Sequence, residues 1–220
     1  MKTHDVITRK VFHSIHKNQI ISKIGFKKIK NLLNCENLKL PKNYFKNKIC
    51  ASFGCGSTGA EGQNLLELGA NYVHLLDLDK HIINPINKNL QKYKGKYQID
   101  IGSIEKTSYK NNYFDFILCS GVIHHLENDI NGLKEIHRTL KKGGAFFSYF
   151  PSKKSKMYRS KKKILYDKDT ILKLKEKRNI FTINNLPFRF LNKRQYVGLL
   201  DQNNLETYYA EELTRTYFNG

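Results

Sequence analysis

Long apolar runs and paired cysteine motifs are missing from this 220-residue sequence. No stretch approaches the roughly 18 apolar residues of a membrane-spanning helix, and the first residues lack the apolar segment of a signal peptide. The four cysteines (Cys35, Cys50, Cys55 and Cys119) include no Cys-x-x-Cys pair. Zinc sites and disulfide frameworks are therefore not indicated, and we expect a cytoplasmic protein with reduced thiols.

Acidic residues are also scarce, with 19 Asp and Glu against 39 Lys and Arg and a net charge of +20. A basic chain raises the hypothesis of nucleic-acid binding. Only 7 of the 39 basic residues are arginine, whose planar guanidinium reads bases and clamps phosphates. Lys, Asn and Ile are all abundant, which is typical of an AT-rich coding sequence. Nucleic acid is thus not the favoured partner, and an anionic small molecule is compatible with the charge.

The arrangement of apolar residues predicts an α/β fold. Residues 1–47 show an approximate 3.6-residue period, which predicts a helical N-terminal cap. From residue 48 to 220, short apolar runs alternate with helical segments, as in successive βαβ units. We expect a Rossmann-like, mainly parallel seven-stranded sheet with helices on both faces. The expected strands are 49–53, 72–76, 97–99, 114–119, 145–150, 205–211 and 214–218.

A basic insertion at about 151–190 interrupts this pattern. Its stretch 153–163 carries many lysines, which favours a solvated surface, with contact to an anionic acceptor or to RNA as the alternative. We expect helices at 169–178 and 192–203.

Local signals mark the ends of three other helices. Thr58 and Glu61 have the spacing of a capping box, so they predict a helix start. Asn84 followed by Pro85 predicts a second start, with the helix running to about residue 93. The pair Gly143-Gly144 predicts the stop of a helix that begins near residue 130.

A glycine-rich turn and an acidic residue indicate a nucleoside cofactor. The motif Gly54-x-Gly56-x-x-Gly59 follows the first strand, where glycine lets the backbone approach a ligand and a helix N-terminus offers N–H groups. Asp77 lies 23 residues beyond Gly54, at the end of the next strand, where it could accept hydrogen bonds from both ribose hydroxyls. It could instead cap the following segment, a role equally open to Asp79. A nicotinamide dehydrogenase and an S-adenosylmethionine (SAM) enzyme both fit these features.

Two further segments decide between these classes. The segment Gly102 to Leu126, with Phe114-Asp-Phe-Ile-Leu-Cys-Ser-Gly-Val-Ile-His-His, and the segment Leu133 to Gly144 resemble class I SAM-dependent methyltransferases. The resemblance is closest to the branch that includes ubiquinone- and menaquinone-methylating enzymes, and it covers residues 49–150. It implies an enzyme that transfers a methyl group from SAM to a small-molecule acceptor.

The resemblance also implies a cofactor site, residue by residue. Gly54, Cys55 and Gly56 would line the methionine part and Asp77 would bind the ribose. Ser103 and Ile104 would lie beside the adenine, and Ser120 would face the methionine amino group. Phe53, before the turn, and Leu78, after Asp77, complete the expected cofactor site. Two departures from the family pattern bear on cofactor affinity: Ser52 stands where an acidic residue is usual, and the glycine loop is one residue longer.

Histidines provide the candidate catalytic groups. His124 and His125 follow the fourth strand and could act as a general base, or could pack or cap the turn. His13 and His16 share a helix face; without further ligands in the sequence we expect them on a solvated surface and expect no metal. The side chains at positions 149 and 150, Tyr and Phe, could wall the acceptor pocket or belong to the core.

Two other functions stay open. An RNA or protein methyltransferase is disfavoured because Ser120-Gly-Val-Ile occupies the place of the Asn/Asp-Pro-Pro-Tyr motif common in amino-group methylation of nucleobases and glutamine. A SAM-binding partner protein without catalysis is the second alternative, and Ser52 is the feature that supports it.

Overall fold

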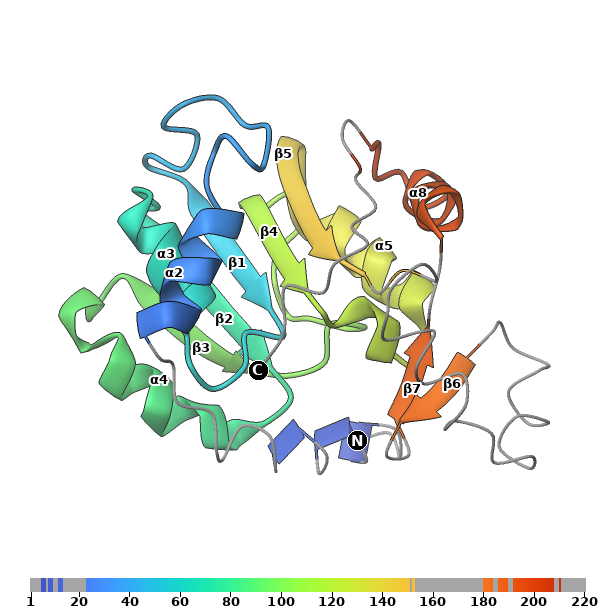
Figure 1. Ribbon diagram of the computed structural model, residues 1–220, viewed down its shortest axis with the longest axis horizontal. Helices are drawn as coiled ribbons and strands as arrows, with labels where there is room; N and C mark the ends of the chain where they lie inside the picture. The colour runs from blue at the N-terminus through green and yellow to red at the C-terminus, as the bar shows by residue number, and fades with distance from the viewer. Residues whose placement is uncertain are drawn as a thin grey trace.

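The structure is a computed structural model, and its central feature is a parallel sheet with helices on both faces (Figure 1). The structure describes residues 5–6, 8–9, 12–13, 23–150, 152, 180–183, 186–189, 192–207 and 210. The sheet has the order β3-β2-β1-β4-β5, and each neighbouring pair is parallel. Its strands are β1 (Ile49–Phe53), β2 (Tyr72–Asp77), β3 (Tyr97–Ile101), β4 (Phe114–Ser120) and β5 (Leu140–Tyr149).

Helices and a separate hairpin complete the described part of the chain. The α-helices are α2 (Lys23–Leu32), α3 (Ala60–Glu67), α4 (Ile83–Asn89), α5 (Asp129–Thr139) and α8 (Lys193–Asp201). Short 3-10 turns are η1 (Lys80–Ile82), η2 (Gln91–Tyr93) and η3 (Ile123–His125), and β6 (Ile180–Ile183) pairs with β7 (Leu186–Arg189) in an antiparallel hairpin. Among these helices none is long and apolar enough to cross a membrane.

Alternating side chains of the central strands build a core on each face of the sheet. On one face, Phe116 and Leu118 of β4 belong to a cluster with residues of α3 and α4. On the other face, Ile117 and Cys119 belong to a cluster with Leu133 of α5. This period of two places β4 in the middle of the sheet with both faces buried, which matches its nearly continuous apolar sequence.

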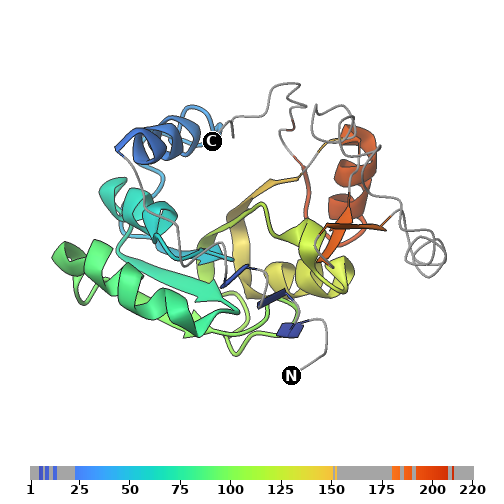
Figure 2. The same ribbon diagram turned by 60° about the horizontal axis from the view of Figure 1, so that its bottom comes forward.

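The strand order has a switch point between β1 and β4. The chain runs outward from β1 to β3, then returns to β4 on the other side of β1. In parallel α/β sheets a crevice opens outside the carboxyl ends of the strands at this point, and ligands bind there. Figures 1 and 2 both show short N-terminal pieces of the chain across this end of the sheet. The predicted Rossmann-like architecture is therefore confirmed.

The number of strands in the described sheet is five and not the expected seven. Residues 205–207 form no strand, and most of the two closing strands that we predicted lies outside the described residues, as does the predicted helix 169–178. Part of the predicted insertion forms the hairpin β6-β7, and the predicted helix 192–203 is confirmed as α8.

One predicted helix start is confirmed with a different cap, and two other predicted helix ends were wrong. Helix α3 begins at Ala60 as the Thr58 signal indicated, and the Ala60 N–H donates to the Thr58 hydroxyl over 3.4 Å, but Gly59 (φ 65°) takes the cap position and Glu61 bonds to Ser52 and not back to the cap. Helix α4 begins at Ile83, before Pro85, and ends at Asn89, with η2 after it. The glycines at 143 and 144 lie inside β5 and not at a helix stop. They occupy an irregularity in its pairing with β4, where a bulge takes up extra residues.

Candidate functional site

The glycine turn after β1 lies against the ends of two neighbouring strands. Gly54 and Gly56 have φ values of 75° and 61°, which side chains rarely adopt. The Gly54 N–H donates to the carbonyl of Leu76 in β2 over 2.7 Å. A Cβ atom at Gly54 would lie 2.3 Å from Cγ2 of Val122, just beyond β4. The turn therefore needs glycine both for its backbone conformation and for its packing.

Asp77 lies beside this turn, as predicted. Its Oδ2 accepts a hydrogen bond from the Gly56 N–H and its Oδ1 one from the Asp79 N–H, both over 3.0 Å. The capping role that the sequence left open belongs to Asp79, whose side chain accepts from the His81 N–H at the start of η1. The carboxylate of Asp77 thus stands at the tip of β2, at the switch point.

The other predicted cofactor residues have different surroundings. Ile104, after β3, is 5% exposed and packs in the cluster that contains Leu76 and Leu126. The Ser103 hydroxyl accepts from the Glu105 N–H over 3.3 Å. Phe53 is completely buried and stacks on Tyr109 beneath the turn, so its side chain belongs to the core. Leu78 is half-buried and Cys55 is buried.

The two candidate catalytic histidines belong to a group of ring side chains. His124 is 4% exposed, and its ring centroid lies 4.0 Å from that of His125 and 5.5 Å from that of Phe150. Phe12 packs edge-on against His125 at 5.2 Å, and Tyr196 of α8 lies 4.6 Å from Phe150. The hairpin strand β7 also contacts η3. Segments far apart in the sequence therefore meet beyond the ends of β4 and β5.

The His13 side chain is 39% exposed, but it also contacts a buried carboxylate, which we did not expect. Its Nδ1 lies 3.2 Å from Oδ2 of the fully buried Asp79, whose Oδ1 lies 2.7 Å from Nδ1 of His81. The ligand atoms of these three residues lie within 4.8 Å of one another, a spacing that a metal ion could bridge. The sequence did not reveal the cluster because 66 residues separate His13 from Asp79. His16 lies outside the described residues.

Sequence reasoning also missed the role of Glu61. The Ser52 hydroxyl donates to Oε2 of Glu61 over 2.7 Å, and Ser120 of β4 forms a second side-chain hydrogen bond with this carboxylate. Burial raises the pKa of Glu61 to about 7, although these two hydrogen bonds act in the opposite direction. The only sequence signal was the missing acidic residue at position 52.

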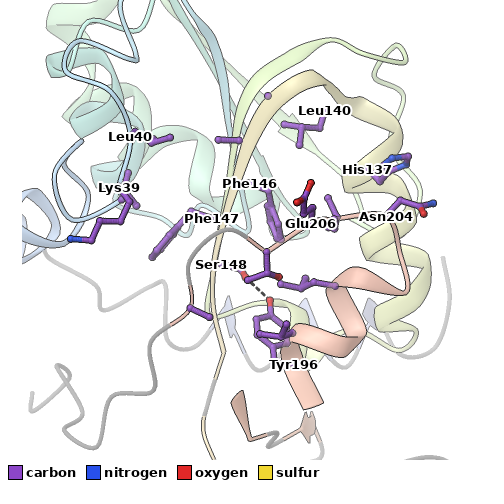
Figure 3. Close-up of a pocket in the computed structure, with 18 of the residues that line it drawn as sticks. Lys39, Leu40, His137, Leu140, Phe146, Phe147, Ser148, Tyr196, Asn204 and Glu206 are labelled. Carbon is purple, nitrogen blue, oxygen red and sulfur yellow. Dashed lines mark hydrogen bonds between the residues drawn. The ribbon is translucent and has the colours of Figure 1, made fainter. Parts of the chain in front are cut away.

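A large cavity of about 1350 Å³ runs along β5 (Figure 3), and Phe150 and Tyr196 of the ring group belong to its lining. It is lined by Leu40, Phe146 and Tyr196, among others, and Tyr196 bonds to Ser148 there. None of the predicted cofactor or catalytic residues lines it. The predicted cofactor residues lie instead around the switch point, where Asp77 bonds to the glycine turn.

Fold and geometry together define a Rossmann-like domain in which a glycine turn and an acidic strand end meet at the switch point of the sheet. The sequence of residues 51–148 matches the family model of a methyltransferase domain. Residues 51–148 therefore form a SAM-dependent methyltransferase domain, with SAM as its cofactor. No sequence among the curated proteins matches it significantly.

Solved structures share this fold at low sequence identity. A SAM-dependent methyltransferase from Thermotoga maritima is 18% identical with a TM-score of 0.54, over 90% of this chain and 76% of that one. A proposed SAM-dependent methyltransferase from Listeria monocytogenes is 18% identical with a TM-score of 0.60, over 81% and 82%. A chain from the complex of a Haloferax volcanii methyltransferase with the Trm112 methyltransferase activator is 13% identical with a TM-score of 0.60, over 89% and 75%.

Proposed function

We propose that the protein transfers the methyl group of SAM to a small-molecule acceptor that binds beyond the ends of β4 and β5. The observation that carries this proposal is the group of rings formed by Phe12, His124, His125, Phe150 and Tyr196. Phe12 packs on His125 in this group, and His124 is buried. Buried and half-buried rings of this kind suit a small molecule better than an RNA strand.

The chain has the groups that a bound SAM molecule requires. The turn from Gly54 to Gly56 would hold the methionine part, and Asp77 would accept from the ribose hydroxyls. Ser103 and the buried Ile104 would lie beside the adenine, and Ser120 beside the methionine amino group. When bound, SAM supplies an activated methyl group on a sulfonium; the protein orients the acceptor and excludes water.

A general base is needed only when the acceptor atom carries a proton. His125 is half-buried and His124 buried, so we assign proton removal to His125 and the support of its ring to His124. An imidazole suits this task near neutral pH. The aromatic rings around the pair would hold an apolar part of the acceptor.

The test is turnover by the purified full-length chain, measured as formation of the demethylated cofactor. Phenols, amines, thiols and carboxylic acids, offered as separate pools, would be compared with total RNA and with unmethylated protein. We expect turnover with at least one small-molecule pool. Turnover with RNA or protein alone would overturn the proposal in favour of the macromolecular alternative. Tight SAM binding without any turnover would instead support a non-catalytic partner protein.

A further inference from the structure

We propose that Glu61 binds the ammonium group of the cofactor's methionine part and so takes over the task of the acidic residue that Ser52 replaces. This inference rests on the proposed SAM site. It assigns a binding residue on α3, outside the glycine motif and outside the strand ends from which such residues were expected.

The position of Glu61 carries the first part of the argument. It is the second residue of α3, directly after the glycine turn, and its side chain reaches back toward the ends of β1 and β4. There it bonds to the hydroxyls of Ser52 and Ser120. Ser52 is completely buried and Ser120 is partly exposed, so Ser120 lies on the more open side of the buried carboxylate. That is the side on which the amino group of the methionine part was predicted.

The charge of the Glu61 carboxylate also favours binding of an ammonium group. The hydroxyl partners of Glu61 are neutral, and among the described residues no Lys, Arg or His forms a salt bridge with it. The chain nevertheless has 39 basic residues. Burying a carboxylate without a cation costs free energy, which an incoming cation recovers. The two serine hydroxyls fix its orientation, and a primary ammonium group, with three donors, can bond to the same oxygens.

A purely structural role gives a different expectation. An acidic residue in the first turn of a helix also interacts favourably with the helix dipole. If that were the whole role of Glu61, its loss would change stability and would affect all ligands of the crevice equally. Selective loss of affinity for ligands that carry the ammonium group separates the two roles.

The experiment compares two ligands by calorimetry at pH 8. S-adenosylhomocysteine has the complete amino-acid tail, whereas 5′-methylthioadenosine has the same nucleoside and thioether without that tail. We expect Glu61→Gln to weaken the binding of S-adenosylhomocysteine about 10- to 100-fold, because a charged hydrogen bond is lost. The binding of methylthioadenosine should weaken by less than about twofold. Glu67→Gln on the same helix, where Glu67 pairs with Lys30, is the matched control and should change neither affinity.

A transplant and a pH series complete the design. Adding Ser52→Asp to the Glu61→Gln variant returns a carboxylate to the usual position and should recover most of the lost affinity. In the unaltered protein, Glu61 must be ionised to bind the ammonium group of the ligand. S-adenosylhomocysteine affinity should therefore fall about tenfold from pH 8 to pH 6, and methylthioadenosine affinity should not. This series needs no variant, so it holds even if Glu61→Gln does not fold.

The outcomes distinguish the inference from the function on which it rests. Equal effects of Glu61→Gln on both ligands, or no effect on either together with a flat pH series, would overturn the assignment of Glu61 and leave the SAM site intact. Failure of the unaltered protein to bind either ligand would overturn the SAM site itself.

Discussion

Replacing Glu61 by Gln should stabilise the ligand-free protein, although it weakens cofactor binding. Burial raises the pKa of this carboxyl group from an ordinary value of 4.5 to about 7. Below pH 4.5 the group is protonated in both the folded and the unfolded chain, so it does not affect stability. As the pH rises, the unfolded chain ionises first and the folded state loses stability until the pH passes about 7. Glutamine has no such loss.

The size of the effect follows from the shift of the pKa. Each pKa unit corresponds to about 1.4 kcal/mol, so the gain of Glu61→Gln in the free energy of unfolding should grow from less than about 1 kcal/mol at pH 5 to about 3 kcal/mol at pH 8. Urea denaturation of both proteins at the two pH values measures it. Glu67→Gln, which removes salt bridges to Lys30 and Lys92, should give no gain. A gain that is the same at both pH values would refute the argument, because it would show that Glu61 ionises freely in the folded chain.

Three further variants or treatments test other parts of the site. Gly54→Ala should lower the free energy of unfolding by about 2–4 kcal/mol, because of backbone strain and the clash with Val122. Adding Val122→Ala should restore only part of this lost stability in urea denaturation. Complete restoration would argue against backbone strain. His125→Ala should reduce the turnover rate at pH 7 at least about 100-fold without changing S-adenosylhomocysteine affinity in calorimetry, and an unchanged rate would remove His125 as the base. Dialysis against a chelator should leave turnover unchanged, since we expect no metal at His13, Asp79 and His81; loss of turnover that zinc restores would contradict this expectation.

The sheet, and the meeting of the glycine turn with Asp77, could be predicted because the sequence signals for them are local and repeated. Strand β4 reads as a buried strand from its own residues, and its place beside β1 follows from the rules of parallel α/β sheets. The contact between Asp77 and the turn at Gly56 follows from the same topology, since both lie at carboxyl ends of neighbouring strands.

Other features could not be predicted because residues that carry a local helix signal bond or pair with distant residues instead. Thr58 and Glu61 have capping-box spacing, but Gly59 takes the cap position and Glu61 bonds to Ser52 in β1. The spacing alone could not show that a strand end would offer Glu61 a better partner. In the same way, Gly143 and Gly144 carry the signature of a helix stop, yet the pairing of β5 with β4 uses them in a bulge.

Contacts between residues far apart in the sequence could not be predicted from the sequence alone. The packing of Phe12 on His125 and of Tyr196 on Phe150 brings residues of the two ends of the chain to the crevice. Neither residue belongs to a motif. An acceptor side of the site could therefore be proposed only from the structure, in which these segments lie side by side.

The most direct test of the central claim is calorimetric titration of S-adenosylhomocysteine into the unaltered protein and into Asp77→Ala. Asp201→Ala, an exposed change on α8, serves as the control, and circular dichroism checks that each variant is folded. If the tip of β2 holds the ribose, Asp77→Ala should bind S-adenosylhomocysteine about 10- to 100-fold more weakly than the unaltered protein does. Its affinity for methylthioadenosine should fall by the same factor. Unchanged affinity in folded Asp77→Ala would contradict the account.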